Sequence, residues 1–209
     1  MKIKHAHVIE YLAAFQLEHR QEPEICIVME HAPLGDLAKV VRDAQRHYRS
    51  ASELGDGSAR AADHLGSAQV RAWLGQLASA LRHIHALRVI HRDLAPKNIL
   101  LSARNECKIC DFGLSFQMAS THDVTSEFCG TPYYMSPEVL TAQPYGPMVD
   151  VWSLGAVAFE LMTLRRPFIA LTISSLIVEA QPRVESKRPT RLASKRPIRP
   201  IGRGWPGQA

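Results

Sequence analysis

The sequence has no long hydrophobic run. Among its 209 residues there is no stretch of about 18 uncharged apolar residues, the length that a membrane-spanning helix needs. Residues 1–5 lead into the chain without the apolar block of a secretory signal peptide. We therefore expect no membrane span, and a cytoplasmic or nuclear location.

Cysteine is also scarce, with only four residues: Cys26, Cys107, Cys110 and Cys129. The spacing of Cys107 and Cys110 is one found in zinc and redox sites. However, this pair falls in a predicted strand, where positions i and i+3 face opposite sides. No second closely spaced pair is present to complete a zinc site. We interpret all four as structural cysteines.

Acidic residues are almost absent from the C-terminal end. Residues 183–209 contain eight Lys and Arg against Glu185 alone, whereas the whole chain carries a net charge of +5. The sequence Ser-Lys-Arg-Pro-Thr-Arg at 186–191 recurs at 194–199 with Ile in place of Thr. Such a charged, proline-rich, aromatic-poor segment cannot bury enough surface to fold. We predict a disordered basic tail; binding to nucleic acid, acidic lipid or a nuclear import receptor is the alternative.

The remainder has an ordinary globular composition, and the chain, 46% hydrophobic and 22% charged, is long enough for one core. Residues 5–15 are typical of a turn followed by a strand, and residues 24–29 of a short apolar strand. Asp36 is placed to cap a helix. Residues 42–66 are rich in Ala, Ser, Arg and Gly without a clear period, which predicts an exposed linker or insertion.

Two further helices are predicted. The first begins near Ser67, which is its expected N-cap. The second covers residues 150–162, which are apolar nearly all round and should therefore be buried. The apolar stripe of the first helix consists of Val70, Leu74, Leu77, Leu81 and Ile84.

The most informative stretch joins two motifs. His-Arg-Asp-Leu-Ala-Pro-Lys-Asn occupies residues 91–98, and Asp-Phe-Gly occupies residues 111–113. Between them, Ile-Leu-Leu at 99–101 and Lys-Ile-Cys at 108–110 predict two short strands that hold the loop rigid. The order and spacing of the motifs matter more than either motif alone.

These motifs contain the groups that phosphoryl transfer requires. Asp93 can accept the proton of an attacking hydroxyl group. Asn98 and Asp111 offer hard oxygen ligands for Mg²⁺. The two motifs resemble the catalytic loop and the metal-binding motif of the protein kinase family.

The resemblance implies an α+β fold with ATP and Mg²⁺ as cofactors and a protein Ser/Thr hydroxyl as acceptor. Residues 1–182 would form a partial kinase domain: remnant N-lobe strands, a hinge and the first half of a mainly helical C-lobe. The basic tail, residues 183–209, would follow it. At the hinge, the resemblance makes Met29 the gatekeeper and assigns adenine binding to the backbone of Glu30 and Ala32. Asp36 and Leu100 would also belong to the nucleotide site.

Residues 130–138, Gly-Thr-Pro-Tyr-Tyr-Met-Ser-Pro-Glu, resemble the end of a kinase activation segment in its serine/threonine form. In that family Thr131 hydrogen-bonds near the catalytic aspartate. Glu138 normally pairs with an arginine that we do not find here. Together with Gly35-Asp-Leu-Ala, this segment looks most like the NIMA-related group.

The resemblance also implies supporting roles. His91 and Phe112, which precedes Gly113, would pack and link the motifs, and Asp150 would tie down the catalytic-loop backbone. Arg92 would pair with a phosphorylated residue of the activation segment. The corresponding position, three before Gly130, is Glu127, which we hypothesise to be a permanent anion for Arg92; a solvent-facing glutamate is the alternative.

The activation segment also offers Thr125 and Ser126 as candidate phosphorylation sites. Two residues depart from the serine/threonine pattern. Ala95 replaces a lysine that contacts the transferred phosphate, and Lys97 lies where many tyrosine kinases have an arginine with that task. Lys97 also replaces an acidic residue that selects basic substrates in some kinases, so an arginine-directed preference is less expected.

No glycine-rich phosphate loop, strand lysine or partner glutamate precedes the hinge in this sequence. We therefore expect a kinase domain truncated at both ends, with apolar surface exposed on its central helix. A catalytically dead kinase-like binding module or a truncated gene product is the alternative function. Nucleic-acid binding through the basic tail is a less expected third.

Overall fold

A computed structural model describes residues 3–17, 24–53, 65–120, 122–170 and 172–181. The predicted basic tail, residues 183–209, lies outside the described residues. The helices are α1 (Leu37–Glu53), α2 (Ser67–Ala86), α3 (Pro137–Leu140), α4 (Met148–Thr163) and α5 (Ile173–Ala180). The strands are β1 (Tyr11–Leu17), β2 (Glu24–Met29), β3 (Val89–Ile90), β4 (Ile99–Leu101), β5 (Cys107–Ile109) and β6 (Phe116–Gln117). Two 3-10 turns are η2 (Pro96–Asn98) and η3 (Pro132–Tyr134).

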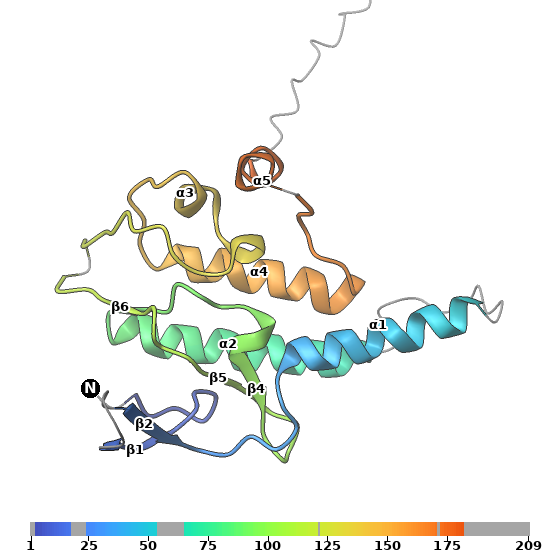
Figure 1. The fold of residues 1–209 in the computed structure, drawn as a ribbon, viewed down its shortest axis with the longest axis horizontal. Coiled ribbons are helices and arrows are strands. Elements are labelled where there is room, and N and C mark those ends of the chain that lie inside the picture. The colour runs from blue at the N-terminus through green and yellow to red at the C-terminus, as the bar shows by residue number, and fades with distance from the viewer. Residues whose placement is uncertain (1–2, 18–23, 54–64, 121, 171, 182–209) are drawn as a thin grey trace, which may run out of the picture.

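Helix α2 lies in the middle of the molecule, with α4 on one side and the short strands β4 and β5 on the other (Figure 1). The strands form three antiparallel pairs: β1 with β2, β3 with β6, and β4 with β5. The main core gathers where α1, α2, α4 and the β4–β5 hairpin meet. Its fully buried side chains include Leu37, Leu77, Ile84, Ile99 and Leu161. This mixed, mainly helical architecture agrees with the predicted α+β class.

Helix α2 follows the predicted apolar stripe with two differences. Gly66, with a positive φ of 69°, occupies the N-cap position, so the prediction of Ser67 as the cap is wrong. Leu74 is only partly buried, whereas Trp73 and Ala80 are buried. Trp73 can be buried because its indole Nε1 donates a hydrogen bond to the carbonyl of Asn105 at 2.9 Å.

Helix α1 corrects the expectation of a linker from residue 42 onward, because residues 42–53 continue the helix. Asp36 Oδ1 accepts a hydrogen bond from Lys39 N–H at 2.6 Å, which is the cap that the sequence predicts. Val41 and Ala44 are buried against the main core. Two buried residues among many polar ones give only a weak helical pattern in the sequence, so tertiary packing stabilises the helix beyond residue 42.

The β1–β2 hairpin exposes much of its apolar surface. Leu12, Phe15 and Ile25 are 52%, 50% and 76% exposed. The hairpin lies at the end of the molecule, on the far side of α2 from α4 (Figure 1).

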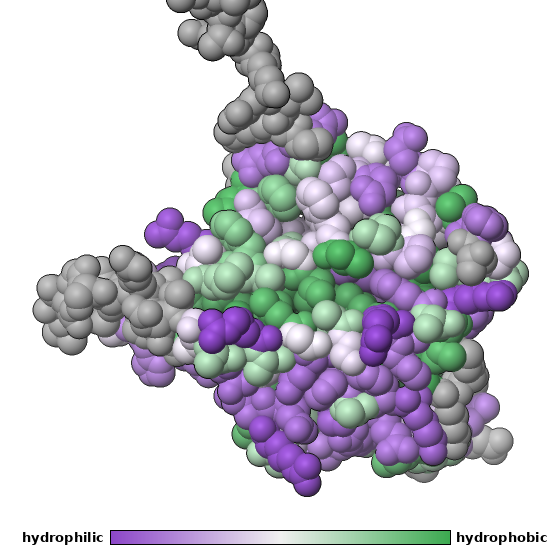
Figure 2. All heavy atoms as spheres, turned by 180° about the vertical axis from the view of Figure 1, so that it is seen from behind, coloured by the Kyte–Doolittle hydropathy of each residue, from purple (hydrophilic) through white to green (hydrophobic). Residues whose placement is uncertain are grey.

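Helix α4 is buried on one face only. Ala156, Val157 and Leu161 enter the main core, whereas Phe159 and Met162 are 42% and 49% exposed. The all-round burial predicted from its composition is therefore wrong, while the apolar exposure expected on this helix is present. A band of hydrophobic side chains crosses the middle of the surface seen from behind (Figure 2). In the described part of the chain, no helix has the length and apolarity to cross a membrane.

Candidate active site

The carboxylate of Asp93, the expected catalytic residue, contacts three neighbours. Asp93 is 6% exposed. Asn98 Nδ2 donates to both the backbone carbonyl and the Oδ2 atom of Asp93, each at 2.8 Å. Thr131 Oγ1 donates to the other oxygen, Oδ1. Lys97 Nζ lies 3.2 Å from Oδ2 and remains 54% exposed. The carboxylate of Asp93 is therefore fixed in orientation, with an exposed cation beside it.

Local geometry explains why these residues converge. Residues 96–98 form η2, which begins at a proline and turns the chain so that Asn98 faces back toward Asp93. Strands β4 and β5 follow and return the chain to residue 111, with Ile99 opposite Ile109. The second strand begins at Cys107, one residue earlier than predicted.

His91 links the two motifs through the core. It is fully buried; its Nε2 donates to the Cys110 carbonyl at 2.9 Å, and its Nδ1 accepts from Asp93 N–H at 3.3 Å. Its ring packs edge-on against Phe112, with ring centroids 4.9 Å apart. The predicted packing positions of His91 and Phe112 therefore lie in direct contact.

Asp150 anchors the catalytic-loop backbone from α4. Its fully buried carboxylate accepts from His91 N–H and Arg92 N–H, each at 2.9 Å, and contacts His85 Nε2 at 2.7 Å. Arg92 has φ +68°, in the left-handed region that non-glycine residues rarely adopt. The two carboxylate oxygens of Asp150, which accept the N–H groups of His91 and Arg92, stabilise this backbone conformation. His85 is a contributor that the sequence did not indicate.

Arg92 reaches the activation segment. Its Nη1 donates to Glu127 Oε2 at 2.7 Å, and its guanidinium lies 5.6 Å from the Phe116 ring centroid. The Arg92 side chain is 8% exposed and that of Glu127 62% exposed. Partial burial opposes the charge of Arg92, yet hydrogen bonds to Glu127 and Tyr145 raise the pKa of its guanidinium. The structure thus brings Glu127 to the place where we hypothesise a permanent anion.

Tyr145 also anchors the activation segment, and sequence reasoning missed it. Its hydroxyl donates to the Glu127 carbonyl at 2.7 Å, and its backbone pairs with Thr125 in both directions. Burial raises the pKa of Tyr145 to about 12, so it remains a neutral donor. No pattern in the sequence identifies this tyrosine, because its partners lie 18 and 20 residues upstream.

Gly130 allows the activation segment to approach the catalytic loop. It has φ +113°, and a Cβ at this position would lie 2.5 Å from the Arg92 carbonyl oxygen. Any larger residue must therefore displace backbone. Glu138, which ends the same segment, makes no ion pair with the residues that the structure describes.

The two expected metal ligands follow the loop. Asp111 is exposed and has φ +62°; among the described residues, its side chain is bonded only through Oδ1, by Gly113 N–H at 3.2 Å. Asn98 uses its Nδ2 on Asp93, which leaves its Oδ1 free to bind a cation. No group of three or more His, Cys, Asp or Glu in the described chain could hold a metal ion. These residues fit Mg²⁺ that arrives with phosphate oxygens and water, because Mg²⁺ often takes only one or two protein ligands.

The hinge presents unpaired backbone groups. Within the described residues, neither the Glu30 carbonyl nor the Ala32 N–H has a hydrogen-bond partner. Met29 is 48% exposed beside them. Leu100 pairs with Asp36 in an isolated bridge, which ties the hinge to β4.

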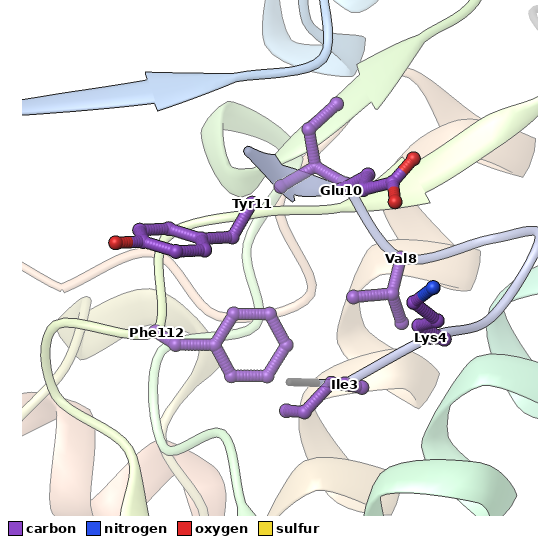
Figure 3. Close-up of a pocket in the computed structure, with 7 residues that line it drawn as sticks. Ile3, Lys4, Val8, Glu10, Tyr11 and Phe112 are labelled. Carbon is purple, nitrogen blue, oxygen red and sulfur yellow. The ribbon is translucent and has the colours of Figure 1, made fainter. Parts of the chain in front are cut away.

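A small hollow lies behind the Asp-Phe-Gly motif. It has a volume of about 220 Å³ and is bordered by Phe112, Tyr11, Ile3 and Val8 (Figure 3). Its lining is mainly apolar, with Lys4 at the side (Figure 3). The Asp-Phe-Gly motif is therefore bordered by open space on this side of Phe112.

The closely spaced cysteines are both buried and free. Burial raises the pKa of the Cys107 thiol to about 12 and that of Cys110 to about 11. Neither is a thiolate near neutral pH, and the thiolate is the reactive form. This geometry is that of structural cysteines.

Comparison with known proteins gives the family. The sequence model of the protein kinase domain matches residues 1–196. The chain belongs to the protein kinase family. The matched range includes the first part of the basic tail.

Curated relatives of this kinase chain are serine/threonine kinases. Serine/threonine-protein kinase fused of Drosophila melanogaster is 35% identical over 176 residues, which cover 84% of this chain and 19% of that protein. Kinase TIO of Arabidopsis thaliana is 36% identical, with coverage of 84% and 12%. Kinase Nek5 of Homo sapiens is 32% identical, with coverage of 85% and 22%. The last confirms a likeness to NIMA-related kinases, and the chain spans less than a quarter of each relative's length.

Proposed function

We propose that this chain is a serine/threonine protein kinase that transfers the γ-phosphate of Mg·ATP to a protein hydroxyl group. The observation that carries the proposal is the hydrogen-bonded arrangement of Asp93, Asn98 and Thr131. An aspartate held in this way presents a carboxylate in fixed orientation. Positioning of this kind supplies much of the catalysis in phosphoryl transfer.

Each residue has a chemical task. Asp93 orients the acceptor hydroxyl and takes its proton as the new O–P bond forms, while the bond from the γ-phosphorus to the bridging oxygen breaks and ADP leaves. Lys97 Nζ, 3.2 Å from Asp93 Oδ2, brings positive charge to the place where the phosphate is transferred. Asn98 and Asp111 would hold Mg²⁺, which would supply positive charge to the phosphate oxygens. Thr131 keeps Asp93 from rotating.

The hinge accounts for nucleotide binding. Among the described residues the Glu30 carbonyl and the Ala32 N–H have no hydrogen-bond partner, so they offer an acceptor and a donor two residues apart. Adenine carries a complementary donor and acceptor on one edge of its ring. Met29 and Leu100 supply apolar contact beside them, and Asp36 fixes the end of the hinge through its cap on α1.

A kinase-like binding module is the second candidate, and one observation favours it. Both carboxylate oxygens of Asp93 already accept hydrogen bonds, and Lys97 adds an ion pair to one of them. With both oxygens engaged, an acceptor hydroxyl reaches the carboxylate only by displacing one of these contacts. Under this alternative the loop holds its shape but does not turn over ATP.

Calorimetric titration with Mg·ATP tests the proposal. The wild-type chain should bind Mg·ATP, and Asp111→Ala should lose that binding because a metal ligand is removed. Asp123→Ala is the control, since it removes a half-buried acid of the same segment whose carboxylate accepts hydrogen bonds from the nearby Ala119 and Ser120. Absence of binding by a chain that circular dichroism shows to be folded would contradict the kinase proposal. Binding without phosphate transfer would favour the binding module.

A further inference from the structure

A second hollow, of about 470 Å³, lies between α1, the end of α4 and the turn η3. None of its lining residues belongs to the catalytic group described above. Its charged and aromatic lining residues are Arg42, Arg49, Tyr133, Glu160, Arg165 and Arg166, and Gln45 adds a neutral polar group whose amide donates to the Leu164 carbonyl. We refer to it as the arginine hollow.

Positive charge dominates the arginine hollow. Four guanidinium groups line it against one carboxylate, that of Glu160. Arg42, Arg49 and Arg165 are exposed, and none forms an ion pair with any residue in the described part of the chain. Unpaired guanidinium groups gathered around one depression favour an anionic ligand, because arginine binds carboxylate and phosphate through paired N–H donors.

The single acid of the hollow is already engaged. Glu160 is 6% exposed and accepts a hydrogen bond from the Tyr134 hydroxyl. Burial, and then the neighbouring Glu160, raises the pKa of Tyr134, so the tyrosine remains a proton donor. Glu160 therefore serves the interior and does not neutralise the exposed arginines.

One wall of the hollow is fixed in place. The Arg166 guanidinium carbon lies 4.2 Å from the Tyr133 ring centroid, a stacked cation–π contact. Val41, Leu164 and Ile169 add apolar surface to the lining. A site with both guanidinium groups and apolar walls suits a peptide, whose side chains and backbone offer both kinds of contact.

The hollow adjoins the catalytic loop through two elements. Tyr133 lies two residues beyond Thr131, which donates to Asp93. Helix α1, which carries Arg42, packs against η2, the turn that contains Lys97. A chain that places its hydroxyl at Asp93 can therefore continue into the arginine hollow.

We propose that the arginine hollow binds acidic side chains, carboxylate or phosphorylated, of the polypeptide that the kinase phosphorylates. This inference rests on the proposed function, because it names the substrate class of the same site. The exposed cation of Lys97 extends the positive surface toward Asp93. The preferred substrate is thus a peptide with a Ser or Thr and acidic residues near it. The acidic residues should lie either before or after the Ser or Thr in sequence but not on both sides, because the arginine hollow lies on one side of Asp93.

The test compares two double variants of the whole chain that change its charge equally. Arg42→Ala/Arg165→Ala removes two exposed arginines of the hollow and leaves the stacked Arg166 in place. Arg71→Ala/Arg104→Ala removes two exposed arginines elsewhere and is the control. Because both retain the basic tail, any effect of that tail is common to them.

Fluorescence anisotropy without nucleotide measures binding of a labelled peptide that carries Asp and Glu beside one Ser. We expect the hollow variant to bind about tenfold more weakly than wild type, since two charge-assisted contacts are lost. The control should bind within about twofold of wild type. Replacement of both hollow arginines by lysine should restore most of the affinity, and a phosphoserine-containing peptide should show the same dependence.

Equal weakening in hollow and control variants would overturn the inference, because the binding would then follow net charge alone. Tighter binding of a single-stranded oligonucleotide, lost in the same hollow variant, would overturn it in favour of nucleic acid. Phosphate transfer that ignores acidic residues on either side of the Ser would also overturn it while the proposed kinase activity stands. Hollow-dependent peptide binding without phosphate transfer would support it and contradict the kinase activity.

Discussion

The anchor formed by Asp150 gives the sharpest prediction. Its fully buried carboxylate accepts two backbone N–H groups at 2.9 Å, from His91 and Arg92, and also contacts His85. Asp150→Asn preserves the shape but replaces one acceptor oxygen by an NH₂ group. At least one buried donor then faces another donor. Leaving a buried donor unsatisfied costs about 1–3 kcal/mol.

The Arg92 backbone adds to this loss, because its φ of +68° persists only while its surroundings hold it. We expect Asp150→Asn to lower the free energy of unfolding by about 2–4 kcal/mol. For a chain of this size that corresponds to a drop in Tm of roughly 5–15 °C. Thermal unfolding followed by circular dichroism measures the drop, and amide hydrogen exchange should show faster exchange at His91 and Arg92.

Asp43→Asn is the matched control. Asp43 is partly exposed on α1, and its two partners, Lys39 and Arg46, are 62% and 74% exposed. Solvent screens such surface pairs, so their loss should leave the unfolding temperature close to that of wild type. An Asp150→Asn chain that unfolds at the same temperature as Asp43→Asn, with unchanged exchange at Arg92, would refute the anchoring role.

Three further variants test other contacts. Gly130→Ala should lower the free energy of unfolding by about 1–3 kcal/mol, because residue 130 has φ +113° and the new Cβ would lie 2.5 Å from the Arg92 carbonyl oxygen. Gly155→Ala is the control: its Cβ would meet nothing within 4 Å, so the variant should be neutral or stabilising in thermal unfolding. Glu127→Ala should lower the free energy of unfolding by about 0.5–1 kcal/mol, and Glu127→Gln should lower it less. Glu127→Ala should also lower the rate of phosphate transfer, and an unchanged rate would contradict the hypothesis of a permanent anion. Burial lowers the pKa of His5 below its unfolded value of 6.5, so the folded chain binds fewer protons and stability should fall as pH decreases below about 6.5. His5→Asn should flatten that dependence in thermal unfolding at about pH 7.5 and about pH 5.5; an unchanged slope would contradict the assignment.

The catalytic loop could be predicted because its chemistry is local. Asp93 and Asn98 lie five residues apart, and one turn of chain brings them into contact. The β2 strand also has the predicted bounds, because its apolar run is short and bounded. Structure that depends on residues only a few positions apart can therefore be predicted from the sequence.

Other features depend on distant packing. The continuation of α1 beyond residue 42 requires the core that buries Val41 and Ala44. The exposed face of α4 depends on which elements cover it, and composition alone does not reveal this. Contacts of Tyr145 with residues 18 and 20 positions upstream, and the convergence of three elements at the arginine hollow, arise only in the folded chain.

Phosphate transfer itself tests the central claim most directly. The purified chain is incubated with Mg²⁺ and γ-labelled ATP together with a Ser/Thr peptide mixture, and label incorporation is compared between wild type, Asp93→Asn and Asp123→Asn. The account predicts transfer by wild type and by Asp123→Asn, and loss of transfer in Asp93→Asn, because the asparagine cannot take the hydroxyl proton. A wild-type chain that binds Mg·ATP but transfers no label, or an Asp93→Asn chain as active as wild type, would contradict it.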